Sequence, residues 1–383
     1  MIGVALLAAC KKDPPTGPAP VSSAVVAEAL PRCRADAKEM AIPGEDVVVG
    51  DAIATDKEIV LGVVRRNASK RVGSIVRMPI DLASVKTIDV APAFGEEPAP
   101  SPRLVKKDVK VAWYTRKLGE DAGAPTTGGM APGTRTLHVG KLAGDAIEEE
   151  GVVVQQADES SMFDVAWPEA GAPLVAWDED APIAVGEFLP DRGRVKTTIL
   201  GAKDPDGGAP KIAVVSPYAT DADTPRVVAT AKGYVLAWLA RRPESTEDAG
   251  IVPEGPGEER AFRWVEAVDL SPSGEAAGPI RRVSPDRGHV VSFDLVREGG
   301  EVFVVAQDEA AYQEHAGSRV VRYPLAEKGK GEDLVDAGVG RALSEIVEVP
   351  PEVRGEGAAD TPKARERDGG VTRWLAWTDA ADH

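Results

Sequence analysis

The stretch LVAWDED, residues 174–180, places a tryptophan directly after a small residue in an otherwise aliphatic run. Similar stretches occur elsewhere in the chain: IVLGVVRR (59–66), VKVAWYTR (109–116), YVLAWLARR (234–242), VFVVAQDE (302–309) and TRWLAWTD (372–379). Alignment puts one marker position in register, at intervals of 50–70 residues: Val63, Trp113, Trp177, Trp238, Gln307 and Trp377. The residue before each marker is always small: Gly62, Ala112, Ala176, Ala237, Ala306 and Ala376.

These stretches have the pattern of buried β-strands. Successive side chains of a strand point to opposite faces of its sheet, so each marker lies on one face and its small neighbour on the other. Both faces are apolar, which is expected when neighbouring layers cover both. Stacked sheets interdigitate when bulky and small residues alternate. We therefore expect the marker strand to be the one on which each repeat packs against the next.

Other strands are expected around each marker strand. A second strand is expected after the marker strand, at residues 75–82, 137–145, 183–193, 266–274 and 320–329. A third is expected before it, at residues 46–54, 162–167, 225–230 and 289–296. Several strands in each repeat of about 60 residues predict an all-β fold, a β-propeller of about six or seven blades over residues 44–383. The alternative is a pair of stacked β-sandwiches.

The repeats are not all alike, because four of them contain turn-rich insertions and the last one is incomplete. The insertions at 119–134, 201–210, 243–259 and 350–370 are expected to be long loops that leave the sheets after similar strands. The last repeat stops at its second strand. We expect either that the N-terminal region supplies the missing outer strands or that the C-terminal sequence is incomplete.

The N-terminus begins MIGVALLAACKKDPPTGPAP. The apolar run at 2–9 is too short to cross a membrane, which takes about 20 residues, but it fits the end of a secretory signal. LAAC, residues 7–10, resembles the lipobox of bacterial lipoproteins, and this resemblance implies lipid attachment at Cys10. Residues 1–10 would then be a signal peptide and lipobox, and residues 11–43 a flexible tether. No Lys or Arg precedes the apolar run, so we expect either a misplaced start or a truncated one. Cys33 is expected to be a small buried residue.

The net charge and the composition limit the classes of binding partner that we expect. The chain has 62 acidic and 45 basic side chains and a net charge of −17, which repels nucleic acid and anionic lipid headgroups. No other run approaches 18 apolar residues, so contact with a membrane is expected only through the lipid anchor. This predicts a bacterial cell-envelope protein, anchored to the outer membrane and facing the periplasm or the cell surface.

The sequence contains no motif that assigns a catalytic, cofactor-binding or metal-binding residue. The four histidines, at 138, 289, 315 and 383, lie far apart, and no zinc, nucleotide or nucleophile-elbow pattern occurs. Three acidic groups remain: Asp178-Glu179-Asp180, Asp204 with Asp206, and Asp221 with Asp223. Aspartate is common where its side chain bonds nearby backbone, and we favour that explanation over a calcium site.

The chain resembles bacterial lipoproteins that carry propeller domains over residues 44–383. That resemblance and the absence of a catalytic motif predict a non-catalytic, monomeric scaffold that binds an envelope protein or a glycan. Two alternatives remain open. One is an envelope hydrolase or lyase that acts on a sugar or lactone with carboxylates in the propeller channel, and the other is an outer-membrane assembly factor.

Overall fold

The computed structural model describes most of the predicted strands and leaves out much of the connecting sequence. The described residues are 2–7, 42–55, 57–67, 70–79, 84–91, 102–105, 109–117, 134–155, 162–180, 193–203, 206–208, 210–241, 263–285, 288–298, 300–308, 318–325, 330–338, 341–349 and 372–379. Cys10 and Cys33 lie outside these residues, as does most of the predicted tether. Within them, no helix is long and apolar enough to span a membrane.

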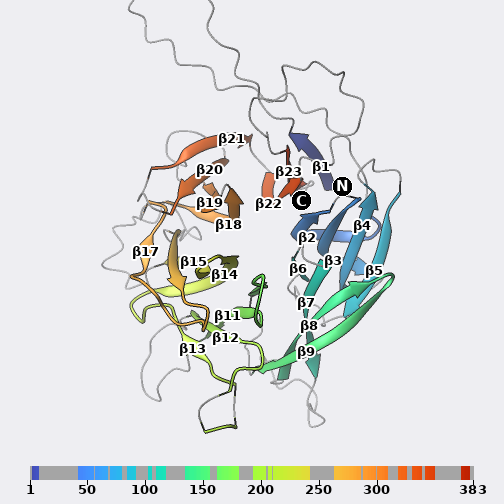
Figure 1. The fold of residues 1–383 in the computed structure, drawn as a ribbon. Helices are drawn as coiled ribbons and strands as arrows, with labels where there is room; N and C mark the ends of the chain where they lie inside the picture. Colours follow the sequence, from blue (N-terminus) through green and yellow to red (C-terminus); the bar gives the residue numbers. More distant parts are fainter. Residues whose placement is uncertain are drawn as a thin grey trace, which may run out of the picture.

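The fold is all-β and consists of antiparallel sheets arranged around a centre (Figure 1). The first blade contains β2 (Glu45–Ala54), β3 (Glu58–Asn67), β4 (Lys70–Pro79) and β5 (Lys86–Ala91). The second contains β6 (Arg103–Val105), β7 (Lys110–Lys117), β8 (Thr134–Ala143) and β9 (Ala146–Gln155). The third contains β10 (Phe163–Ala166), β11 (Leu174–Asp180), β12 (Gly193–Ile199) and β13 (Ala213–Val214).

The fourth blade contains β14 (Asp221–Thr230), β15 (Gly233–Arg241), β16 (Arg263–Leu270) and β17 (Arg281–Arg282). The fifth contains β18 (Val290–Glu298), β19 (Glu301–Asp308), β20 (Ser318–Pro324) and β21 (Glu332–Gly338). In each blade the four strands pair in chain order, with the first nearest the centre and the last at the rim (Figure 1). This arrangement is a β-propeller.

A three-stranded sheet lies between the fifth and first blades. It contains β22 (Arg341–Val349), β23 (Thr372–Asp379) and β1 (Ile2–Leu7), with β23 in the middle. β22 contacts both β2 and β18, the first strands of the two neighbouring blades. The propeller prediction is therefore confirmed, but the structure has five complete four-stranded blades where the sequence predicted six or seven.

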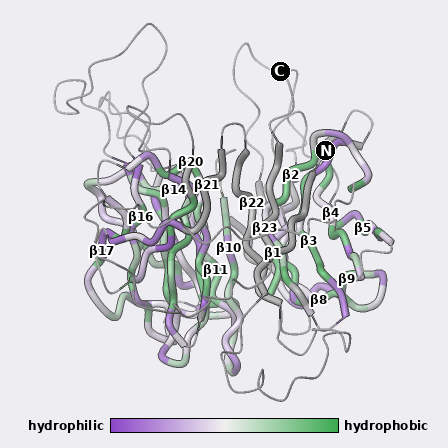
Figure 2. Tube along the Cα trace, turned by 90° about the horizontal axis from the view of Figure 1, so that it is seen from above, coloured by the Kyte–Doolittle hydropathy of each residue, from purple (hydrophilic) through white to green (hydrophobic). Residues whose placement is uncertain are grey.

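Bulky and small residues of adjacent blades interlock as the repeat predicted. Trp238, which is fully buried, lies in one apolar cluster with Ala176 and Leu174 of the preceding blade. Trp177 packs in the same way with Ala112 of the blade before it. Apolar residues accordingly follow the inner and middle strands, whereas hydrophilic ones gather toward the edges (Figure 2). Burial of these faces supplies the main driving force for stacking the blades.

The fifth blade departs from the predicted alignment by one residue. In the second, third and fourth blades the marker faces the preceding blade, but in the fifth blade Ala306 and Val304 cluster with Val265 of the fourth. Ala306 therefore occupies the place that tryptophan has elsewhere, and the predicted marker Gln307 lies on the other face. The irregular pairing between Val290 and Ser292 of β18 accompanies this shift.

The long insertions do not all follow equivalent strands, contrary to expectation. Residues 119–134 and 243–259 connect second to third strands, since they lie between β7 and β8 and between β15 and β16. Residues 201–210 connect β12 to β13, and 350–370 connect β22 to β23. The insertions therefore emerge from more than one end of the propeller.

Candidate active site in the propeller channel

One charged residue stands at an equivalent position on the first strand of every sheet. Each is paired across the ladder with the small residue before the marker, or with Val305 in the shifted fifth blade. The pairs are Asp51 with Gly62, Arg103 with Ala112, Asp164 with Ala176, Arg226 with Ala237, Asp294 with Val305 and, on β22, Glu345 with Ala376. The sign of the charge alternates through the five complete blades.

Four of these residues line a cavity in the channel. Its volume is about 310 Å³, and its walls come from the first strands of all five complete blades. Asp51, Arg103, Asp164 and Asp294 line it, and Trp167 and Arg297 line it nearer the ends of their strands. Polar groups that converge in one concave space are the usual mark of a binding or catalytic site.

Arg103 joins two of the aspartates. Its Nε lies 2.9 Å from Asp164 Oδ1 and 3.3 Å from Asp51 Oδ2, and its Nη1 donates to the carbonyl of Gly50. All three charged side chains are less than a tenth exposed. Loss of one member would leave an uncompensated buried charge, which costs several kcal/mol. Arg103 therefore fixes the geometry of the channel.

Asp164 has both carboxylate oxygens occupied. Oδ1 accepts from the backbone N–H of Val165 at 2.8 Å as well as from Arg103, and Oδ2 accepts from the N–H of Val227 at 2.7 Å. Val227 belongs to β14, so Asp164 ties the third blade to the fourth. This carboxylate holds Arg103 and the two blades in place.

The acidity of the Asp51 carboxyl group is altered by its surroundings. Burial raises the pKa of Asp51 to about 6, because desolvation outweighs the attraction of Arg103, while Asp164 and Asp294 repel its charge. Its Oδ1 accepts from the N–H of Ala52 at 2.8 Å, and its Oδ2 accepts from the N–H of Leu104. A carboxyl group of this acidity can carry a proton near neutral pH, as a general acid must.

Asp294 is held most loosely of the three aspartates. Its charged neighbour is Arg226, whose Nε lies 3.9 Å from Asp294 Oδ1, beyond hydrogen-bond distance. The Asp294 side chain is 15% exposed, about twice the value for Asp164. Asp294 is therefore the channel carboxylate best placed to meet a water molecule or a substrate.

The acidic groups noted in the sequence serve other purposes where the structure describes them. Asp178 Oδ1 accepts from the N–H of Met162, and Oδ2 accepts from the N–H of Thr224 at 2.8 Å. Asp221 Oδ1 accepts from the N–H of Gly193 at 2.7 Å, and Oδ2 pairs with Arg241. Burial raises the pKa of Asp223. Among the described residues, no group of three or more His, Cys, Asp or Glu side chains is arranged to hold a metal ion.

The histidines lie away from the channel cavity or outside the described residues. His138 stacks on Trp113 with ring centroids 5.2 Å apart, and its Nδ1 lies 2.6 Å from Glu149 Oε2. His289 immediately precedes β18, and its backbone N–H donates to Asp308 Oδ1 at 2.9 Å. His315 and His383 lie outside the part of the chain that the structure describes.

No family model matches the sequence, and no curated protein matches it. Among solved structures, the chain is similar to a GH93 α-L-arabinofuranosidase of Fusarium graminearum, at 10% identity over 86% of this chain and 93% of that one, with a TM-score of 0.47. It is also similar to a B. megaterium levansucrase, at 12% identity over 76% and 85% of the two chains, with a TM-score of 0.37. A protein of unknown function from Dyadobacter fermentans shares 12% identity over 87% and 95%, with a TM-score of 0.47.

The contents of the channel correct the predicted function. The sequence favoured a non-catalytic scaffold, whereas the channel contains the converging carboxylates that the hydrolase alternative requires. The scaffold prediction is therefore wrong. Identities near 10% transfer neither a substrate nor a reactive residue to this chain, so any mechanism depends on the channel itself.

Proposed function

We propose that the channel cavity is the active site of a hydrolase that cleaves a glycosidic bond. The observation that carries this proposal is the convergence of Asp51, Asp164 and Asp294 from three different blades on one cavity of about 310 Å³. Their environments differ, and paired carboxyl groups of different acidity are what glycoside hydrolysis requires.

The environments assign a role to each group. Asp51, with its raised pKa, donates a proton to the oxygen of the leaving sugar as the C–O bond breaks. Asp294 takes a proton from the attacking water, whose oxygen forms the new bond to the anomeric carbon. Asp164 and Arg103 hold the charges around them in fixed positions. The product is a pair of free sugars. Asp51 is regenerated when it receives a proton from solvent, and Asp294 is regenerated when it releases one to solvent.

The test is turnover of a panel of disaccharides and methyl glycosides, whose leaving oxygen needs a proton, by the wild type and by Asp51→Asn and Asp294→Asn variants. General acid–base groups contribute about 10²–10⁴ in rate, so each variant should lose at least about a hundredfold in kcat. Asp145→Asn is the matched control, because Asp145 is 66% exposed on the turn between β8 and β9. Wild-type turnover that both channel variants retain would refute the proposal, as would no turnover of any glycoside.

We also propose that Cys10 carries a lipid and that the protein faces the periplasm or the cell surface from a bacterial outer membrane. The support is the LAAC sequence and the low-aromatic, proline-containing stretch after it. Intact-mass analysis of the envelope protein should show acyl chains that a Cys10→Ser variant lacks. An unacylated wild type with residues 1–9 retained would refute the proposal.

We infer that the three-stranded sheet serves as a sixth blade. Its support is the contact of β22 with β2 and β18, and the pairing of Glu345 with Ala376, which repeats the register of the other blades. The channel would then be bounded by six first strands.

A further inference from the structure

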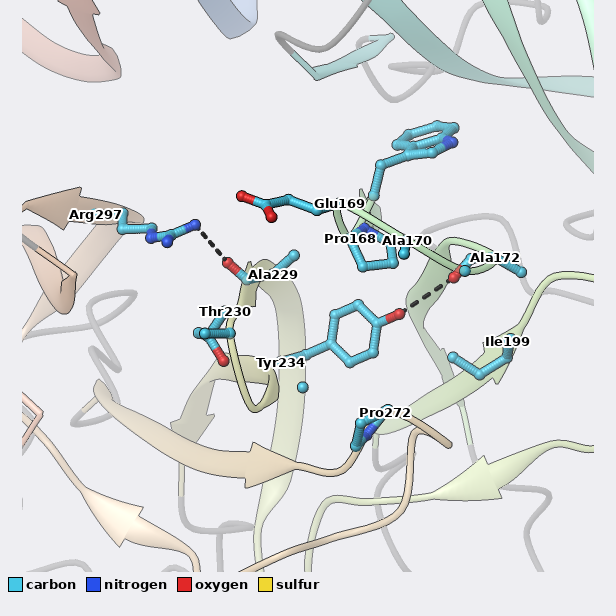
Figure 3. A pocket seen from close by; sticks show the side chains of 14 residues that line it. Pro168, Glu169, Ala170, Ala172, Ile199, Ala229, Thr230, Tyr234, Pro272 and Arg297 are labelled. Atoms are coloured by element: carbon cyan, nitrogen blue, oxygen red, sulfur yellow. Dashed lines mark hydrogen bonds between the residues drawn. The ribbon is translucent and has the colours of Figure 1, made fainter.

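A second cavity adjoins the one in the channel. It has a volume of about 450 Å³ and lies between the turn that follows β10 and the turn that follows β14 (Figure 3). It shares Trp167, Ala229 and Arg297 with the channel cavity. A ligand bound across this boundary would therefore touch both cavities, with Arg297 near the junction.

The lining of the second cavity is largely apolar. Trp167 is half-buried and contributes an aromatic side chain, with Pro168, Ile199 and Pro272 also in the lining. Tyr234 is 3% exposed, and its hydroxyl donates to the carbonyl of Ala172 at 3.2 Å. Burial raises the pKa of Tyr234, which keeps the phenol neutral. An aromatic face with few polar groups suits the C–H face of a sugar ring.

Two charged side chains complete the cavity. Arg297 is exposed, and its Nη1 donates to the carbonyl of Ala229 at 3.3 Å. A guanidinium has five N–H donors, and this bond uses one of them. Glu169 is exposed and extends from the β10 turn toward the side of the cavity on which Arg297 lies (Figure 3). Carboxylates accept hydrogen bonds from hydroxyl groups, and a guanidinium binds a carboxylate through two parallel bonds.

We propose that this second cavity is a subsite for a uronate, the carboxylated sugar next to the glycosidic bond cleaved in the channel. The sugar ring lies against Trp167, its carboxylate pairs with Arg297, and Glu169 accepts from its hydroxyls. The position of this sugar next to a cleaved bond rests on the proposed hydrolase function. Binding of the uronate can be measured without turnover. The net charge of −17 disfavours general attraction of an acidic glycan, so recognition depends on the local cation.

Binding is tested by calorimetry with disaccharides that differ only at C6: digalacturonate against galactobiose, and glucuronyl-glucose against cellobiose. In at least one pair the uronate should bind about tenfold more tightly, and raising the salt concentration should weaken it. Arg297→Gln should weaken that uronate about 10- to 100-fold and leave its neutral partner unchanged, because hydrogen bonds to charged groups are the stronger ones. Arg297→Lys should restore part of the loss.

Trp167→Ala should weaken both members of the pair about tenfold, because it removes the aromatic surface. Lys232→Gln is the control for charge, since Lys232 is an exposed cation on the turn between β14 and β15. Tyr218→Ala is the control for aromatic loss, since Tyr218 is 64% exposed and lies outside the cavity lining. Neither control should change the dissociation constant by more than about twofold.

The outcomes separate this proposal from the hydrolase function. Uronate binding that depends on Arg297, without turnover of any glycoside, supports the subsite and contradicts the hydrolase. Turnover of a uronate substrate that is lost in Asp51→Asn, with the KM for that uronate unchanged in Arg297→Gln and Trp167→Ala, supports the hydrolase and overturns the subsite. Equal binding of the acidic and neutral members of every pair, or no binding, also overturns it.

Discussion

At the scale of single residues, a protonatable group in the channel affects both chemistry and stability. The pKa of Asp51 in the fold, about 6, is higher than its ordinary value of 3.8, so the folded state binds a proton more tightly than the unfolded state does. Below pH 4 the group is protonated in both states and burial carries no charge penalty. As the pH rises through 6, the folded protein must bury a carboxylate and loses stability.

The first prediction follows from this loss of stability with rising pH. The free energy of unfolding of the wild type should fall between pH 4 and pH 6.5 relative to that of Asp51→Asn, by an amount on the order of 3 kcal/mol at about 1.4 kcal/mol per pH unit. Urea unfolding at several pH values measures it. Asp145→Asn is the control, because the hydrogen bond from Lys86 lowers the pKa of Asp145, so its pH dependence lies below pH 4 and its difference from the wild type should stay nearly constant in this window. A constant difference between the wild type and Asp51→Asn would contradict the burial effect.

Gly62 gives the second residue-scale prediction. A Cβ at this position would lie 1.9 Å from the carbonyl oxygen of Pro102, which directly precedes β6 of the next blade. The main-chain atom cannot move without shifting that strand, so Gly62→Ala should destabilise the protein by about 1–3 kcal/mol or more. Gly278→Ala is the matched control, since a Cβ there meets nothing within 4 Å. Comparable thermal midpoints for the two variants would show that the blades can separate to accommodate the methyl group.

At the scale of strands and blades, buried aspartates connect strands of neighbouring blades that share no β-sheet hydrogen bonds. Asp178 on β11 accepts from the N–H of Met162, just before β10, and from the N–H of Thr224 in β14 of the next blade. Thr224 has a φ of 51°, an uncommon value for a β-branched residue, at the irregularity between Asp223 and Arg226. Asp178 thereby holds the bend that brings Arg226 to its place opposite Ala237.

The third prediction tests this connection. Asp178→Ala leaves two backbone donors without their acceptor and should cost about 1–3 kcal/mol for each donor that becomes buried and unpaired. Asp178→Asn retains one carbonyl oxygen and should recover part of the loss. Urea unfolding measures the three proteins, with Asp206→Ala, on an exposed turn, as the control. A full recovery by asparagine would show that only one of the two bonds matters.

The repeat could be found from the sequence because bulky and small residues alternate within one strand, which is a local pattern. The charged position on the first strand could not, because its relation to Gly62 or Ala176 appears only when two strands are paired in register. Arg103 was also hidden by the length of β6, which has three residues. In the fifth blade, the one-residue shift moved Asp294 away from the position that an alignment on Gln307 would give.

At the scale of the whole molecule, β1 covers one edge of the three-stranded sheet that lies between the fifth and first blades. β1 pairs with β23 from Ile2 opposite Thr378 to Leu7 opposite Arg373, and β23 pairs on its other side with β22. A signal peptidase that cleaves before Cys10 would remove β1 and leave one edge of β23 unpaired. Cleavage before Cys10 and the β1–β23 ladder therefore exclude each other in a single molecule.

The fourth prediction uses this exclusion. Amide hydrogen exchange in the peptide 372–379 should be slow in a Cys10→Ser protein that retains residues 2–7, and faster in the processed, acylated protein, because β23 loses the strand that covered its outer edge. Peptides from β15, which is paired on both sides in the fourth blade, should exchange equally slowly in both forms. The exposed edge is also a place where another strand can add. If residues 372–379 are equally protected in the acylated protein, a different segment must cover β23 after cleavage, and the ring closes without β1.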